Sequence, residues 1–151
     1  MIALPELDRL LVESACRDLV MKAARCTDAQ DHDGFAALFA EDATVTRPVG
    51  QPLQGREAIL ASYRARPKER ITRHLVSNCI VEVVSAGEAR ATSCVQVWSA
   101  TAGLEASAFG LKAHPRVAVG EFDDRFVFVP GQGWRISQRE ARFVMHSGDD
   151  A

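Results

Sequence analysis

The chain lacks any run of apolar residues close to the roughly 20 that a membrane-spanning helix needs. It also lacks an excess of basic residues, because 18 Lys and Arg are balanced by 20 Asp and Glu and no basic run of five residues occurs. Proteins that bind nucleic acid carry a clustered positive charge. The sequence therefore argues against a membrane protein and against a nucleic-acid-binding protein.

Cysteine is sparse and widely spaced. Cys16, Cys26, Cys79 and Cys94 form no Cys-x-x-Cys pair. The first twenty residues are rich in charged side chains, whereas a signal peptide needs an uncharged apolar run followed by a cleavage site. In a chain without a secretion signal, cysteines are expected to stay reduced and to pack as small hydrophobes. We therefore predict a cytoplasmic protein.

Several motifs that hold metals or cofactors are missing. No cluster of His, Asp or Glu has metal-ligand spacing, no glycine-rich phosphate loop occurs, and no Gly-x-Ser-x-Gly elbow is present. We predict a site with no dedicated metal and no cofactor. A length of 151 residues with 47% hydrophobic content suits one domain with its own core. We predict a single domain over residues 1–151, in which residues 147–151 form a frayed tail.

The chain divides into a helical first part and a strand-rich second part. Apolar residues recur at helical spacing in three segments and follow a strand-like pattern in six. The predicted helices are 5–25, 33–40 and 56–66, and the predicted strands are 43–47, 71–85, 88–100, 104–112, 117–129 and 134–145. This order indicates an α+β fold in which an antiparallel meander packs on N-terminal helices. Strands this long must curl, and a curled sheet closed by helices forms a cone around a pocket.

Four fragments are distinctive as a set. They are FAALFAEDA at 35–43, GREAI at 55–59, RHLVSN at 73–78 and GWRI at 133–136. Together they resemble the SnoaL-like branch of the nuclear-transport-factor-2-like superfamily. The resemblance covers nearly the whole chain and implies a cystatin-like cone, with helices on a strongly curved antiparallel or mixed sheet that encloses a pocket. Because that superfamily holds dehydratases, isomerases, cyclases and non-catalytic binders, the site must decide the function.

Two residues carry the catalytic hypothesis. Asp28 follows the first predicted helix among small apolar residues, and His74 opens the longest predicted strand. A carboxylate bonded to one imidazole nitrogen fixes the tautomer and makes the other nitrogen a general base. Thr27-Asp28 and Arg73-His74 resemble the Asp/His dyads of scytalone dehydratase and hexachlorocyclohexane dehydrochlorinase. The resemblance implies that His74 removes a proton from carbon while a β leaving group departs.

Other interpretations of these residues stay open at this point. An Asp just after a helix also caps the next helix, and a His at a strand start is more often a core or rim residue. Arg139 lies where the dehydrochlorinase pattern has an arginine. Pointing inward, it would hold a leaving anion or an enolate oxygen. Pointing outward, it would pair with Glu121 or Glu140 on a solvated face.

The chain also departs from both patterns. Ala23 stands where the dehydrochlorinase pattern has a lysine, and Trp98 lies in the region of the second histidine of scytalone dehydratase. Tyr63 is the single tyrosine, whereas the dehydratase pattern uses two. A dehydratase-like reaction here would therefore polarise the substrate carbonyl differently, through Asn78 or Arg139.

The predicted pocket wall follows from strand alternation. On a regular strand, residues two and four apart share a face, so Val76 and Asn78 should join His74. We predict that Asn78, Val76, Tyr63 and Trp98 bind a small, largely apolar ligand, although alternation leaves open which face carries Trp98. The opposite face is also apolar, which predicts self-association as a dimer or trimer.

The leading hypothesis is a cofactor-independent lyase that acts on a small, largely apolar cyclic substrate. One alternative is a non-catalytic ligand-binding or assembly module, like the small subunit of ring-hydroxylating dioxygenases. Another is a polyketide-cyclase-like or isomerase-like enzyme that uses the same pocket. Replacing Asp28 and His74 separates the first from the second, because an assembly module needs neither residue.

Overall fold

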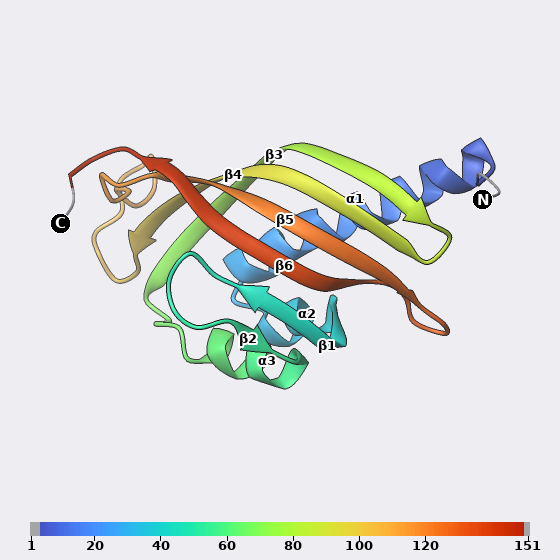
Figure 1. Cartoon of the computed structure of the whole chain (residues 1–151). Coiled ribbons are helices and arrows are strands. Elements are labelled where there is room, and N and C mark those ends of the chain that lie inside the picture. Colours follow the sequence, from blue (N-terminus) through green and yellow to red (C-terminus); the bar gives the residue numbers. More distant parts are fainter. Residues whose placement is uncertain (1–3, 150–151) are drawn as a thin grey trace.

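The computed structural model describes residues 4–149 of the chain. Helices come first and long strands follow, as predicted (Figure 1). The elements are α1 (Glu6–Asp28), α2 (His32–Ala37), β1 (Phe39–Thr46), β2 (Leu53–Gln54), α3 (Arg56–Arg64), β3 (Arg70–Ser85), β4 (Glu88–Thr101), β5 (Ala118–Val129) and β6 (Gly133–His146). Within the described residues, no helix has both the length and the apolar character needed to cross a membrane.

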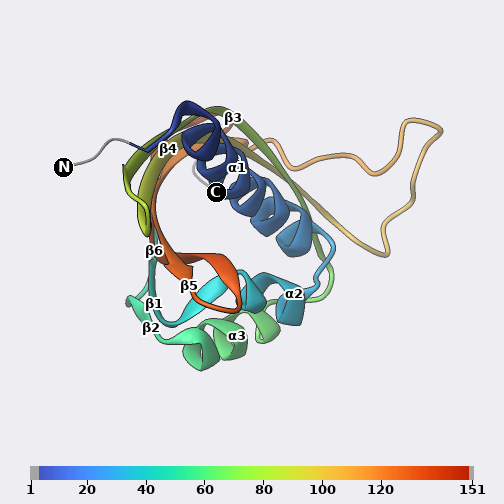
Figure 2. The same cartoon turned by 90° about the vertical axis from the view of Figure 1, so that its right-hand side faces the viewer.

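The strands form one mixed sheet in the order β2-β1-β6-β5-β4-β3. Strands β3 to β6 are an antiparallel meander, while β1 pairs with β6 in parallel and with β2 antiparallel. Figure 2 shows the sheet arching without closing, with α1 beside β3 and β4 and the two shorter helices beside β1 and β2. The predicted α+β architecture, helices on a strongly curved mixed sheet, is confirmed.

Helix α1 is amphipathic along only part of its length. Cys16, Val20 and Ala23 recur at helical spacing and are fully buried against the sheet. Leu7 and Leu11 lie half a turn away from this stripe and are 67% and 60% exposed. All buried residues of α1 lie from Cys16 onward, so the C-terminal half anchors the helix in the core.

Aromatic side chains join the two shorter helices to β1. The ring centroid of Phe35 lies 4.1 Å from that of Tyr63 and 4.9 Å from that of Phe39, and all three are buried. Helix α2 begins with a side-chain cap, since Asp31 accepts a hydrogen bond of 2.9 Å from the amide of Gly34. A Cβ on Gly34 would lie 2.1 Å from an Asp31 carboxylate oxygen, so a larger residue here would displace the capping carboxylate.

Strand β3 contains a bulge that reverses its alternation. The pairing with β4 shifts between Ser77 and Ile80, and Asn78 has a left-handed φ of 51°. A bulge adds one residue to a strand, so the residues beyond it change face. Accordingly, Ile80 is 69% exposed and Val81 is buried. The expectation that Asn78 continues the face of His74 is wrong, because it rested on a regular strand.

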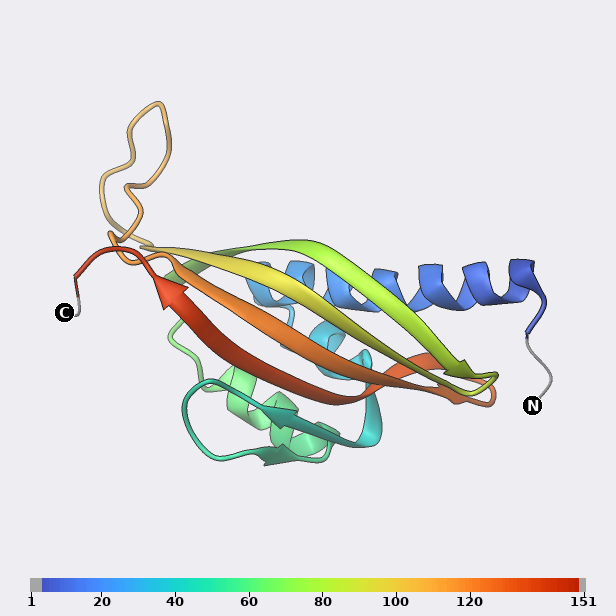
Figure 3. The same cartoon turned by 45° about the horizontal axis from the view of Figure 1, so that its top comes forward.

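The segment 104–112 is not the strand that its pattern predicts. It forms one isolated bridge, between Ser107 and Gly110, and Phe109 is fully exposed. Figure 3 shows this loop rising away from the sheet, where no neighbouring strand can pair with it. Of the predicted tail 147–151, Ser147 is hydrogen-bonded to Pro115 and Val117, whereas residues 150 and 151 lie outside the described residues.

Candidate active site

Asp28 and His74 meet where the end of α1 crosses the start of β3. The carboxylate of Asp28 accepts three hydrogen bonds, all from β3. One oxygen accepts from the backbone amide of His74 at 2.8 Å, and the other accepts from the Thr72 hydroxyl at 2.9 Å and bonds the His74 Nδ1 at 2.6 Å. Because Asp31 caps α2, Asp28 is left for this role. Both side chains are mostly buried, with 12% exposure for Asp28 and 15% for His74.

The hydrogen bond with Asp28 fixes the tautomer of His74. An ionised carboxylate has no hydrogen to give, so Nδ1 donates and Nε2 keeps a free lone pair. Nε2 makes no hydrogen bond with a described residue, and it is not one of the fully buried polar atoms that lack a partner. The basic nitrogen is therefore accessible from the space beside the pair.

Burial sets the pKa of His74. Desolvation lowers the pKa below 6.5, while the hydrogen bond and the charge of Asp28 raise it and the charges of Arg66 and Arg139 lower it. Burial outweighs the carboxylate in the net result. The imidazole is thus mainly neutral at pH 7, which is the form that can accept a proton.

Arg139 points into the same interior. Its Nε and Nη2 bond the two carboxylate oxygens of Asp124 at 2.7 and 2.8 Å, and its guanidinium carbon lies 4.1 Å from the ring centroid of Phe122. Burial lowers the pKa of Arg139, but the charge and hydrogen bonds of Asp124 raise it to a net value above the ordinary one. Glu121, a partner considered for an outward Arg139, pairs with Arg142 instead. Nη1 of Arg139 has no partner among the described residues and is not fully enclosed.

The predicted ligand-binding residues divide between the two faces of the sheet. Val76 and Tyr63 lie on the inner side and pack with the core. Trp98 pairs in register with Arg73, one residue before His74, and is 42% exposed, so it belongs to the outer face. Asn78 is also exposed and contacts Cys94 on that face. This corrects the assignment of Asn78 and Trp98 to the ligand.

Comparison with protein families places the chain in a family. A family model described as a SnoaL-like domain matches residues 8–140. The chain belongs to the SnoaL-like family. No curated protein matches the sequence of this SnoaL-like domain.

Solved structures of similar shape cover almost the whole SnoaL-like domain. A candidate scytalone dehydratase from Novosphingobium aromaticivorans is 23% identical, with a TM-score of 0.79 over 95% of this chain and 91% of that one. A type-3 hexachlorocyclohexane dehydrochlorinase from Novosphingobium barchaimii is 19% identical, with a TM-score of 0.80 over 97% and 96%. A nuclear-transport-factor-2-like protein with a cystatin-like fold from Novosphingobium aromaticivorans is 23% identical, with a TM-score of 0.70 over 90% and 84%. These likenesses show a shared fold.

Two charged residues of the site are not among the predicted site residues. Asp124 belongs to an acidic pair that is typical of a strand edge, yet it is fully buried because it lies opposite Arg139 in the register. Arg66 follows α3 directly, and its guanidinium carbon lies 3.7 Å from the ring centroid of Tyr63. The three-residue spacing from Tyr63 at a helix end was the available signal for that contact.

Two surface hollows of the SnoaL-like domain lie elsewhere. One, of about 290 Å³, is bordered by the start of α1 and by Phe128 and Trp134. The other, of about 410 Å³, is formed by the loop that carries Phe109. Neither borders Asp28 or His74, so the predicted pocket at the dyad stays a prediction.

Proposed function

We propose that this SnoaL-like domain is a cofactor-independent lyase in which His74 removes a proton from a carbon of the substrate. The observation that supports it is the Asp28–His74 pair, which fixes one imidazole nitrogen at 2.6 Å and leaves Nε2 accessible. A neutral imidazole near pH 7 is well matched to general-base catalysis. Asp28 orients the ring and stabilises the imidazolium that forms.

In the proposed elimination, Nε2 of His74 takes the proton, the electrons of the C–H bond form a carbon–carbon double bond, and the β leaving group departs with its bonding pair. The proton then passes from His74 to the leaving group or to water. Negative charge develops on the substrate during proton removal, and Nη1 of Arg139 is the donor that would stabilise it in this water-poor interior. Asp124 keeps that guanidinium in place by two hydrogen bonds.

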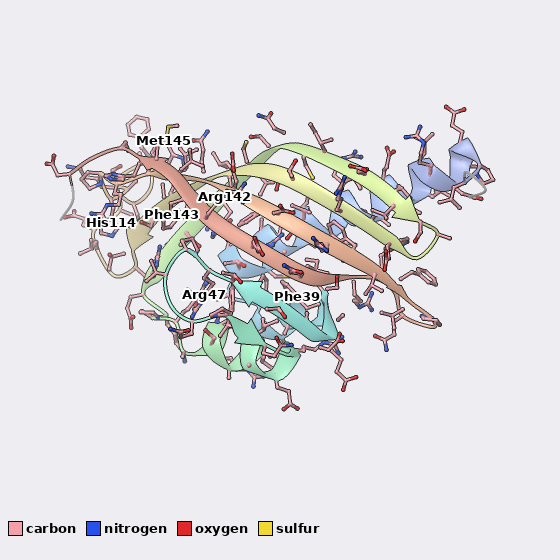
Figure 4. The ribbon with its side chains drawn as sticks, in the orientation of Figure 1. Phe39, Arg47, His114, Arg142, Phe143 and Met145 are labelled. Atoms are coloured by element: carbon pink, nitrogen blue, oxygen red, sulfur yellow. The ribbon has the colours of Figure 1, made fainter. Side chains whose placement is uncertain are left out.

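The substrate would be small, cyclic and largely apolar. Val76 follows His74 on the same face and is only partly buried, so it offers apolar surface to a ring. Tyr63 lies on the inner side, buried between Phe35 and Arg66. We also propose self-association as a dimer or trimer through the outer face of the sheet. That face exposes large apolar side chains, among them Leu75, Ile80 and Met145, of which Figure 4 labels the last.

The test uses a panel of cyclic ketones with a β-hydroxyl group in deuterated water. Proton NMR follows both exchange at the carbon and formation of the alkene. We expect His74→Gln to lower the rate by about 10²–10⁴-fold, the usual contribution of a general base. The matched control is His114→Gln, since His114 is exposed and bonds Thr101 on the loop side. Equal rates in His74→Gln and the wild type would contradict the proposal.

Two other functions fit specific observations. An isomerase-like or cyclase-like reaction would use the same base, and the product formed in the NMR assay separates it from elimination. A non-catalytic assembly module is favoured by the exposed apolar outer face alone. In that case Asp28→Asn and His74→Gln would leave ligand binding and the oligomeric state unchanged.

A further inference from the structure

Three arginines that form no ion pair with a described carboxylate lie near one another, since the charges of two of them act on the third. They are Arg47 just after β1, Arg66 just after α3 and Arg70 at the start of β3. In Figure 1 the ends of β1 and α3 and the start of β3 lie at the same end of the molecule, and Figure 4 labels Arg47 there. Every ion pair of the described residues involves other side chains.

Direct contacts place two of these arginines on the last turns of α3. Nη1 of Arg47 donates to the Ser62 hydroxyl at 3.0 Å, and the guanidinium carbon of Arg66 lies 3.7 Å from the ring centroid of Tyr63. Both contacts lie on the last turns of α3, and the charge of Arg47 acts on Arg66, so the two guanidinium groups lie near each other. Burial lowers the pKa of Arg66, and the charges of Arg47 and Arg70 lower it further while Tyr63 raises it.

The bonding of this pair is incomplete. Nε of Arg47 is fully enclosed and has no hydrogen-bond partner, whereas its Nη2 is not enclosed and bonds no described residue. Arg66 is half-buried and has the Tyr63 ring and a side-chain hydrogen bond with Tyr63 against its charge, but no ion pair with a described carboxylate. Arg139, by comparison, meets a carboxylate with two hydrogen bonds. A ligand cannot reach the enclosed Nε, but the accessible guanidinium nitrogens of Arg47 and Arg66 are donors that an oxyanion of a ligand can bind.

The arginine cluster acts on the catalytic base. The positive charge of Arg66 is one of the influences that lower the pKa of His74, so the two side chains share one electrostatic environment. An anion bound to Arg66 would offset this charge and so raise the pKa of His74. A planar guanidinium matches a carboxylate or phosphate group with parallel hydrogen bonds.

We propose that Arg66 and Arg47 bind an oxyanion, a carboxylate or phosphate group, that the substrate carries on its apolar ring. This inference deepens the proposed function and rests on it, because only that function makes the bound molecule a substrate. The binding of the anion to the two arginines does not require turnover. The ring would lie toward Val76 and Tyr63, and the anion would hold it against the base.

Calorimetric titration of the full chain with three probes tests the anion site. The probes are benzoate, phenyl phosphate and the neutral benzamide, which share one ring. We expect the two anions to bind at least about tenfold more tightly than benzamide, the gain from one charge-assisted hydrogen-bonded pair. Tighter binding of benzoate would identify a carboxylate substrate, and tighter binding of phenyl phosphate would identify a phosphate.

Charge-matched variants locate the site. Arg66→Gln should remove the preference for anions, and Arg66→Lys should keep part of it. Arg64→Gln is the control, because it removes the same charge from an exposed residue two positions earlier that pairs with Asp33. If Arg66→Gln fails to fold, Arg47→Gln tests the same site and should also weaken the preference for anions. Equal binding of benzoate and benzamide by the wild type, or equal losses in Arg64→Gln and Arg66→Gln, would overturn the inference.

His74→Gln separates this inference from the proposed lyase. It should still prefer benzoate to benzamide even though it loses elimination. Anion preference without any elimination would support the oxyanion site while contradicting the lyase. Elimination without a preference for anions would support the lyase while contradicting the oxyanion site.

Discussion

The molecule holds two carboxylate-centred pairs in one interior, and they are built differently. The Asp28 carboxylate is held by three bonds from β3, and its imidazole partner keeps one nitrogen open. Asp124 and Arg139 face each other through two parallel hydrogen bonds, and both are almost completely buried. The first pair can change its protonation state, whereas the second keeps its charges fixed.

The largest effect is expected from breaking the fixed pair. Asp124→Ala leaves the guanidinium of Arg139 buried without a counter-charge, which should lower the free energy of unfolding by about 3–5 kcal/mol. Urea denaturation measures this change. Glu82→Ala is the control, since its pair with Arg90 is about 60% exposed and should be worth about 1 kcal/mol or less. Equal losses in the two variants would show that burial of the fixed pair does not matter.

A smaller effect is expected from Asp28→Asn. The amide keeps an acceptor oxygen but loses the charge, so the pKa of His74 should fall further below 6.5. The lost charge-assisted hydrogen bonds should lower the unfolding free energy by roughly 1–3 kcal/mol. An NMR titration of the imidazole measures the first change, with Asp33→Asn as the control because Asp33 is exposed and pairs with Arg64. An imidazole that titrates identically in wild type and Asp28→Asn would mean that the two residues are not coupled.

The smallest effect is the pH dependence of stability due to His74. The folded pKa lies below the ordinary 6.5, so between these two values the unfolded chain binds more protons than the folded one. The unfolding free energy should therefore rise with pH through this window and should gain nothing more from this group above it. The difference between wild type and His74→Gln, measured by urea denaturation at several pH values, isolates the contribution. A wild type that loses stability as the pH rises through the window, relative to His74→Gln, would contradict the assigned shift.

The sequence predicts the Asp28–His74 pair better than the Asp124–Arg139 pair. Asp28 and His74 lie in fragments whose residue types are distinctive, so their pairing could be predicted from the resemblance. The burial of Asp124 could not be predicted in the same way, because it depends on the position of Asp124 opposite Arg139. The local sequence of a strand does not determine its register with the neighbouring strand. The bulge in β3 was missed for a related reason. Asn78 tolerates a left-handed φ, but a single Asn within a strand is a weak signal.

The loop over 104–112 shows a different limit of structure prediction from sequence. Its apolar residues suit a strand, yet a strand exists only where a neighbour offers a free edge, and this segment projects from the sheet. Pattern alone therefore predicts whether a segment could pair, while the tertiary arrangement decides whether it does.

The bulge at Asn78 divides β3 into two stretches with separate duties. Before it, alternate residues of β3 such as His74 and Val76 face the space where chemistry is proposed; after it, Val81 belongs to the packed core. Substitutions in the first stretch can thus alter what the protein recognises while the second stretch keeps the fold intact. One strand therefore serves both the candidate site and the core, and a change of side chain at the first need not disturb the second.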